Sequence, residues 1–184
     1  AAAVALGSAL VAARDQEATF CVVTADHVIG NIDVFQQTLR DSMKLSLDRD
    51  VLITMGIPPV FPSTGFGYID AGDPIQCDGK TEFLNAKRFV EKPDAATAQN
   101  YVEAGHYFWN SGMFIWSVVS IQGALEQYAP ALMGMAERIA AVAGKPEFDD
   151  QLRDEYNQLE KISIDYAIME KAGNIVMAKG KFAW

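Results

Sequence analysis

The sequence of 184 residues has little basic charge and few cysteines. Its 15 Lys and Arg residues stand against 24 Asp and Glu residues, so the net charge is -9 and no broad basic surface is expected. Nucleic acid is therefore not an expected partner. Cys21 and Cys77 have neither the density of a disulfide framework nor the spacing of metal ligands, which favours a reducing, cytoplasmic location.

Long apolar runs are also lacking. The most apolar stretch, residues 1–13, is interrupted by Gly7 and Ser8 and is shorter than the roughly 20 residues that span a bilayer. No basic segment precedes it, so neither a membrane partner nor a signal peptide is expected. With 14 Gly and 7 Pro the sequence is not collagen-like, and 50% hydrophobic residues predict one packed domain over residues 1–184.

Strand-like and helix-like patterns alternate in the first part of the chain. Residues 1–14 predict an Ala-rich helix that is buried on most faces. Residues 19–24 and 51–55 are continuous apolar runs, typical of strands covered on both faces. Asn31 or Asp33 can cap a helix between them that ends near Asp48. This alternation indicates an α/β domain with a mainly parallel sheet.

Further elements are predicted along the rest of the chain. Strands are expected from Tyr68 and over residues 87–91, 107–116 and 175–178, and helices over residues 95–104, 118–128, 130–142, 147–159 and 164–171. Residues 73–80 are polar and rich in turn formers, which predicts a surface excursion. The aromatic side chains of the strand over residues 107–116 are expected in the core.

Polar residues at strand ends are the first candidates for a site, because ligands of open α/β sheets bind outside the carboxyl ends of the strands. Asp26 follows the first apolar strand, where a carboxylate can hold a divalent cation against phosphate oxygens or cap a turn. His27 is expected to pack or to support its neighbours, since His106 is the only other histidine and a metal site needs several ligands.

Three further segments carry side chains suited to a phosphorylated polyol. Gly67 has no Cβ and allows a ligand to approach the backbone closely. The carboxylate of Glu91 can accept hydrogen bonds from two hydroxyls and the ammonium of Lys92 can balance a phosphate, although a surface ion pair is the alternative. The amide of Asn110 can bind sugar hydroxyls or cap a turn.

The order of these segments resembles the sugar-nucleotidyltransferase superfamily and, within it, the mannose-1-phosphate guanylyltransferases. The motifs, which cover nearly the whole chain, are TADHVIG, TGFGYI, FVEKP, FWNSGMFIW, SIDYAIMEK and GKFAW. The resemblance implies a Rossmann-like nucleotidyltransferase fold with a mainly parallel mixed sheet. It also implies transfer of GMP from GTP to mannose 1-phosphate with Mg²⁺, giving GDP-mannose and pyrophosphate by direct attack of the sugar phosphate.

The resemblance implies a role for each candidate residue. Asp26 matches the acidic ligand of Mg²⁺, and Lys92 matches the lysine that neutralises the sugar phosphate. Glu91 matches the carboxylate that receives sugar hydroxyls. Gly67 matches the glycine whose backbone lies against the sugar, and Asn110 matches the amide that reads the other edge of the sugar.

The sequence also departs from the family pattern. None of its 14 glycines adjoins another, so the Gly-Gly-x-Gly-x-Arg loop that grips phosphates in the family has no counterpart, and no aspartate follows Trp184. We therefore expect a central fragment, incomplete at both ends and inactive alone, with activity belonging to a longer chain. The role of Asp165 stays open between a family-specific one and capping together with Ser163.

Two other functions remain open at this point. One is transfer of a nucleotide to another hexose 1-phosphate, because Glu91 and Asn110 suit any hexose. The other is a non-catalytic binding module built on a truncated nucleotidyltransferase fold. Association into a homo-oligomer is left open as well.

Overall fold

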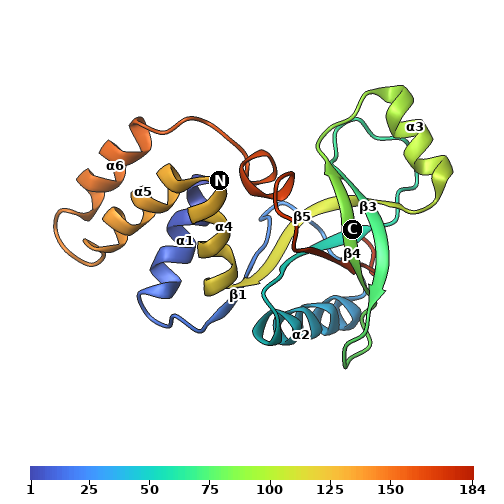
Figure 1. Ribbon diagram of the computed structural model, residues 1–184, viewed down its shortest axis with the longest axis horizontal. Helices are drawn as coiled ribbons and strands as arrows, with labels where there is room; N and C mark the ends of the chain where they lie inside the picture. The colour runs from blue at the N-terminus through green and yellow to red at the C-terminus, as the bar shows by residue number, and fades with distance from the viewer. The chain divides into compact units, whose positions relative to one another are not determined.

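The computed structural model describes all residues 1–184, which divide into two compact units. One comprises Ala1–Ala18 and Ser117–Ala172 and is helical, and the other comprises Thr19–Trp116 and Gly173–Trp184 and carries the sheet (Figure 1). None of the helices combines the length and the apolar character needed to cross a membrane. One domain over the whole chain stays a prediction.

The helical unit is built from four α-helices and one turn of π-helix. They are α1 (Ala2–Ala12), α4 (Val118–Tyr128), α5 (Pro130–Ala140), α6 (Phe148–Asn157) and η1 (Asp165–Met169). α1 packs against α4 and α5, and α5 also packs against α6. The predicted burial of the first helix on most faces is wrong, since only Ala5, Ser8 and Ala9 are buried. A helix of alanines is apolar all round, so its sequence does not tell which face is covered.

Six strands form one sheet in the order β1-β5-β2-β6-β4-β3. Their bounds are β1 (Thr19–Val22), β2 (Leu52–Ile57), β3 (Tyr68–Ile75), β4 (Phe83–Val90), β5 (Tyr107–Ser117) and β6 (Ile175–Lys179). β5 pairs with β3 through residues 107–109 and with β2 through residues 109–115. The pairing of β5 with β3 closes the strands β5, β2, β6, β4 and β3 into a ring.

The sheet is mixed, and the prediction that it is mainly parallel is wrong. β2 runs parallel to β6, but the pairs β2–β5, β3–β4, β3–β5 and β4–β6 are antiparallel. The run of β2 is buried at every position, as predicted. A strand inside a closed ring reaches that burial next to antiparallel neighbours too, so an apolar run reports burial and not direction.

Two other predictions about the strands need correction. β1 ends the strand order and is only half-buried along Thr19–Val22, so its expected cover on both faces is wrong. β3 continues to Ile75, so strand occupies the first part of the surface excursion predicted over residues 73–80. Antiparallel strands with one face in water carry polar residues, and such strands read as loop in the sequence.

The two helices of the sheet unit follow their sequence signals closely. α3 (Ala95–Ala104) has Asp94 as its N-cap, and Asp94 Oδ1 accepts a hydrogen bond from the Thr97 amide at 2.7 Å. Its C-cap is Gly105, with φ 74°. α2 (Ile32–Asp48) has Asn31 as its N-cap residue, with φ 52°. The Asn31 side chain makes no capping hydrogen bond, so only the position of this predicted cap is confirmed.

Asp41 ties the loop before β4 to α2. Its Oδ2 accepts hydrogen bonds from the Lys80 and Thr81 amides, both at 3.0 Å, and from the Thr81 hydroxyl at 2.7 Å. Its Oδ1 accepts one from Gln37 at 2.9 Å. Burial raises the pKa of the Asp41 carboxyl, but the hydrogen bonds from Thr81, Gln37 and Lys80 outweigh burial and hold that pKa below its usual value.

We expect Asp41→Asn to lower the free energy of unfolding by about 2 kcal/mol at pH 7, because the Lys80 and Thr81 amides lose a charged acceptor. A depressed folded pKa stabilises the protein above the unfolded pKa of about 3.9, and this stabilisation is lost as the pH falls through the folded pKa. The difference from the parent should therefore be smaller at pH 3 than at pH 7 in urea unfolding. Asp73→Asn, at an exposed position of β3, is the control. An equal loss at both pH values for Asp41→Asn would contradict the argument.

Candidate active site

Strand pairing brings three of the predicted site residues together in the sheet unit. Tyr68, at the start of β3, is paired with both Val90 of β4 and Trp109 of β5. Gly67 precedes Tyr68, Glu91 follows Val90 and Asn110 follows Trp109. The backbone amide of Asn110 donates a hydrogen bond to the Gly67 carbonyl at 2.8 Å. These three residues therefore meet at one end of the β3, β4 and β5 pairings.

Gly67 is held in a space too small for a side chain. A Cβ built there would lie 2.5 Å from Glu91 Oε2, 3.4 Å from Phe89 Cε1 and 3.5 Å from Asn110 Cβ. A Cβ at Gly65, the other glycine of the motif, would meet only Ser63 Oγ at 3.7 Å. A side chain at Gly67 would therefore displace the Glu91 carboxylate from its observed place.

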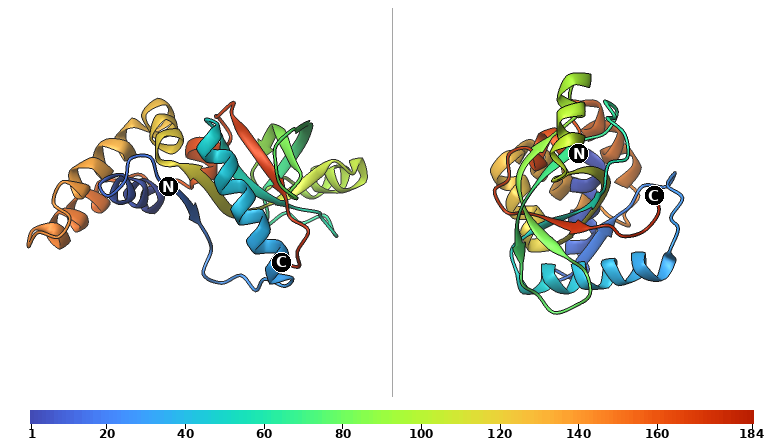
Figure 2. Two further views of the ribbon diagram at one scale, coloured as in Figure 1. Left: turned by 90° about the horizontal axis from the view of Figure 1, so that it is seen from below. Right: turned by 90° about the vertical axis from the view of Figure 1, so that its right-hand side faces the viewer.

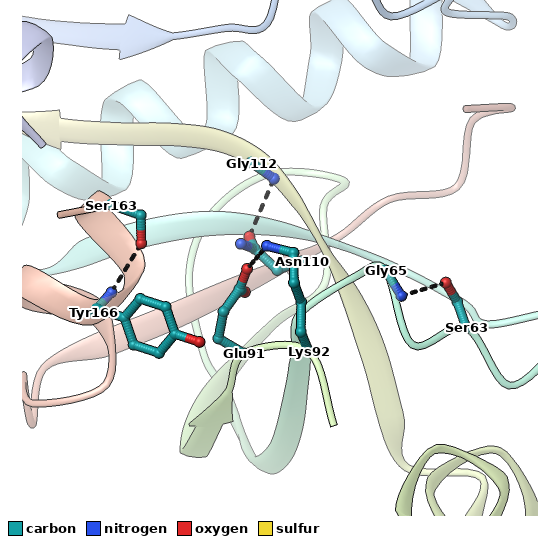
Figure 3. A network of polar contacts seen from close by, with 8 residues as sticks. All are labelled: Ser63, Gly65, Glu91, Lys92, Asn110, Gly112, Ser163 and Tyr166. Atoms are coloured by element: carbon teal, nitrogen blue, oxygen red, sulfur yellow. Dashed lines mark hydrogen bonds and ion pairs between the residues drawn. The ribbon is translucent and has the colours of Figure 1, made fainter. Parts of the chain in front are cut away.

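Glu91 and Lys92 lie on the same side of the chain although they are consecutive. β4 ends at Val90, and Lys92 has φ 44°, a left-handed conformation that is uncommon for a residue with a side chain. This turn lets Lys92 Nζ form an ion pair with Glu91 Oε1 (Figure 3). The side chain of Glu91 is 7% exposed and that of Lys92 is 58% exposed, so a buried carboxylate lies beneath an accessible ammonium.

Asn110 is buried in β5, and protein donors bind the oxygen of its amide. Asn110 Oδ1 accepts a hydrogen bond from the Thr54 hydroxyl at 2.7 Å. It accepts a second one from the Gly112 backbone amide at 3.2 Å (Figure 3). The chain at Gly112 has φ 70°, where a glycine is favoured. Sequence reasoning missed Thr54, although a hydroxyl inside an apolar run was a signal that could have found it.

Asp26 lies in an exposed turn after β1. Its loop is tied to the last residues of the chain, because Trp184 Nε1 donates to His27 Nδ1 at 2.8 Å and the Gly30 amide donates to the Ala183 carbonyl at 2.9 Å. Figure 2 shows this end of the chain beside the start of α2. The expected supporting role of His27 is therefore confirmed as a packing contact.

Aromatic rings connect the segments that carry the candidates. Phe66 contacts Trp109 and Trp184, with ring centroids 5.1 and 5.2 Å apart, and Phe61 contacts Trp109 at 4.9 Å. Trp184 also contacts His27 at 5.0 Å. Residues 27, 66, 109 and 184, from four of the motifs, therefore share one aromatic cluster.

The aromatic side chains of β5 are mostly core, as predicted. Trp109, Phe114 and Trp116 are 4%, 3% and 0% exposed. Phe108 is half-buried, and Lys179 Nζ lies 5.8 Å from the centroid of its ring. The three buried rings are covered by protein and Lys179 lies near the ring of Phe108, so these side chains do not form a platform on which a ligand could stack.

The ligand set on this chain fits part of a Mg²⁺ site. The structure holds no group of three or more His, Cys, Asp or Glu side chains that could hold a metal ion. Mg²⁺ usually keeps several waters and is bound by one or two carboxylates together with substrate phosphates, so a single exposed carboxylate such as Asp26 is suited to it.

Asp165 belongs to the helical unit, where it begins η1. Ser163 Oγ accepts a hydrogen bond from the Tyr166 amide at 3.3 Å (Figure 3), although the N-cap position of η1 is Ile164, which makes no side-chain capping bond. The role of the Asp165 carboxylate stays open.

A model of the family described as nucleotidyl transferase matches residues 1–132. The chain belongs to the nucleotidyl transferase family. The match includes all five candidates, which are Asp26, Gly67, Glu91, Lys92 and Asn110.

Curated relatives of this nucleotidyl transferase chain are much longer than it is. A mannose-1-phosphate guanylyltransferase of Sinorhizobium fredii is 37% identical over 188 residues, which cover 100% of this chain and 35% of that protein. One of Escherichia coli K12 is 34% identical over 182 residues, which cover 96% of this chain and 38% of that protein. The chain therefore spans little more than a third of the length of these relatives.

Two solved structures share the fold along the whole chain. One, described as a mannose-1-phosphate geranyltransferase from Thermus thermophilus, has a TM-score of 0.83 and 29% identity over 100% of this chain and 50% of its own. The other, described as a mannose-6-phosphate isomerase from Helicobacter pylori, has a TM-score of 0.79 and 26% identity over 100% of this chain and 69% of its own. Since these descriptions name different reactions, the residues of the site must distinguish between functions.

Proposed function

We propose that this chain forms the sugar-phosphate-binding core of a mannose-1-phosphate guanylyltransferase. The complete enzyme transfers GMP from GTP to mannose 1-phosphate and releases GDP-mannose and pyrophosphate. The observation that carries the proposal is the meeting of Gly67, Glu91 and Asn110 beneath the ammonium of Lys92. Similarity to the curated guanylyltransferases supports mannose and GTP as the substrates.

Each residue of this group has a distinct part in binding the sugar phosphate. The Glu91 carboxylate accepts hydrogen bonds from sugar hydroxyls, and the Asn110 amino group donates to an oxygen on another edge of the ring. Gly67 lets the sugar lie against its backbone. Lys92, which is 58% exposed and carried on a flexible stem, turns from Glu91 to the phosphate and exchanges one anion for another.

The reaction needs alignment and charge neutralisation and no covalent enzyme intermediate. A phosphate oxygen of mannose 1-phosphate attacks the α-phosphorus of GTP, a new P–O bond forms, and the bond to the β-phosphate oxygen breaks as pyrophosphate leaves. Lys92 holds the attacking phosphate in place and offsets its charge. Mg²⁺, when bound, adds positive charge at the phosphate oxygens, and Asp26 is the residue of this chain that we expect to hold it.

The proposal also includes a Rossmann-like arrangement of the whole domain, a cytoplasmic location and association into a homo-oligomer, with no nucleic-acid or membrane partner. The mixed sheet and the α/β class are the coarser features that the structure and its fold relatives support.

The test is an assay of the native gene product that contains this sequence. Release of pyrophosphate and formation of GDP-mannose from GTP and mannose 1-phosphate are expected, with much lower rates for UTP or for glucose 1-phosphate. A preference for another pair of substrates would favour a different hexose-1-phosphate nucleotidyltransferase. No turnover with any such pair would favour a non-catalytic module.

Lys92→Ala should raise the KM for mannose 1-phosphate about 10- to 100-fold and leave the KM for GTP unchanged, because a hydrogen bond to a charged group contributes about 1.5–3 kcal/mol. Lys44→Ala is a matched control, since the Lys44 side chain is also 58% exposed and also ion-paired. Steady-state kinetics with each substrate varied in turn measures both constants. Equal effects of Lys92→Ala on both KM values would argue against the assigned role.

A further inference from the structure

Thr54 is a polar side chain inside an otherwise apolar strand. It is 0% exposed, and every residue of β2 around it is buried. Its hydroxyl oxygen lies 2.7 Å from Asn110 Oδ1 and 3.3 Å from the Met113 carbonyl oxygen. A hydroxyl has one hydrogen to donate, and the shorter distance assigns this hydrogen to Asn110.

The chain of β5 is bent where it meets this hydroxyl. Thr54 is paired with Phe114 and Gly56 with Asn110, so the register between β2 and β5 shifts by a bulge in β5. Bulges re-aim the side chains beside them and are frequent next to binding sites. Here the bulge brings the Gly112 amide within 3.2 Å of Asn110 Oδ1 as a second donor.

Two donors on one oxygen determine which way the amide faces. If the side-chain amide of Asn110 were turned over, its NH₂ group would stand against the Gly112 N–H, which would lose its acceptor, and the Thr54 hydroxyl would be left with the more distant Met113 carbonyl at 3.3 Å. The amide is therefore held with its oxygen toward β2 and its amino group at the other end. The Glu91 carboxylate supplies the site with a hydrogen-bond acceptor. In this orientation the NH₂ group of Asn110 supplies it with a donor.

We infer that Thr54 is a positioning residue that, together with the Gly112 N–H, holds the side-chain amide of Asn110 in the orientation that suits sugar binding. The inference rests on the proposed function in one respect, which is that Asn110 contacts the sugar. Thr54 itself does not touch the substrate. Its hydroxyl holds the amide in this orientation before the sugar arrives, which reduces the cost of ordering the site.

Thr54→Val keeps the shape of the side chain and removes the hydroxyl, whereas Thr54→Ser keeps the hydroxyl. In the native gene product, Thr54→Val should raise the KM for mannose 1-phosphate about 10-fold, the loss of roughly one hydrogen bond, with kcat and the KM for GTP unchanged. Thr54→Ser should restore the parent KM to within about twofold on the same grounds. Thr38→Val is the matched control, because Thr38 is also buried and its hydroxyl bonds only the Val34 carbonyl of α2, at 2.9 Å.

A second measurement separates this inference from the proposed function. The side-chain NH₂ signals of Asn110 in ¹⁵N-labelled protein should shift or broaden in Thr54→Val and stay in place in Thr54→Ser. If the parent protein does not use mannose 1-phosphate, the proposed function fails, and the NMR signals still decide whether Thr54 orients Asn110. Unchanged signals in Thr54→Val, or an unchanged KM in an active parent, would overturn the inference.

Discussion

Gly67→Ala is expected to lower kcat/KM for mannose 1-phosphate by about 100-fold while the protein stays folded, because a misplacement of about 1 Å in a site costs that much. The new Cβ would lie 2.5 Å from Glu91 Oε2, closer than real Cβ contacts allow. The atom that must move is the end of a side chain and not backbone, so the fold survives. The displaced group is the Glu91 carboxylate, which is proposed to bind the sugar hydroxyls, so we expect sugar binding to be weakened.

Steady-state kinetics and thermal unfolding together measure the effect of Gly67→Ala. Gly123→Ala is the control, because a Cβ at Gly123 in α4 meets no atom within 4 Å. The control should keep the parent kinetics and gain up to about 1 kcal/mol of stability from the better helix propensity of alanine. Parent-like kcat/KM in Gly67→Ala would show that the Glu91 carboxylate does not bind the sugar in its observed place.

Asp26→Asn is expected to lower kcat about 1000-fold, which corresponds to about 4 kcal/mol of lost charge stabilisation at the phosphates. The amide keeps the size of the side chain and loses the charge that attracts Mg²⁺. The melting temperature should not change, since Asp26 is exposed in a turn. The dependence of the rate on Mg²⁺ concentration should move to higher concentrations, because the ion loses a protein ligand.

Asp33→Asn removes the same charge from the same segment and serves as the control for Asp26→Asn. Asp33 is exposed in the first turn of α2, where a carboxylate contributes only about 0.3–1 kcal/mol through the helix dipole. Its kinetics should match the parent. A full rate for Asp26→Asn at low Mg²⁺, or the same loss in both variants, would remove Asp26 from the proposed metal site.

Local signals in the sequence determined several elements of this protein. α3 is predicted to the residue, because an Asp at its start and a Gly after its end act on backbone groups within one turn. The chemistry of the candidate site is also present in the sequence, since a carboxylate, an ammonium and an amide keep their hydrogen-bonding capacities in any fold. The five candidates could therefore be named from the sequence, and the roles of all five stay predictions.

Only the tertiary structure decided how these parts meet. The direction of the strands and the closure of the ring through β5 and β3 depend on pairings between distant segments, which an apolar run such as that of β2 does not record. The same holds for Thr54, whose hydroxyl donates to Asn110, a residue 56 positions away in the sequence. Sequence patterns report burial and chemistry because these act locally, whereas register and side-chain orientation arise from contacts between segments.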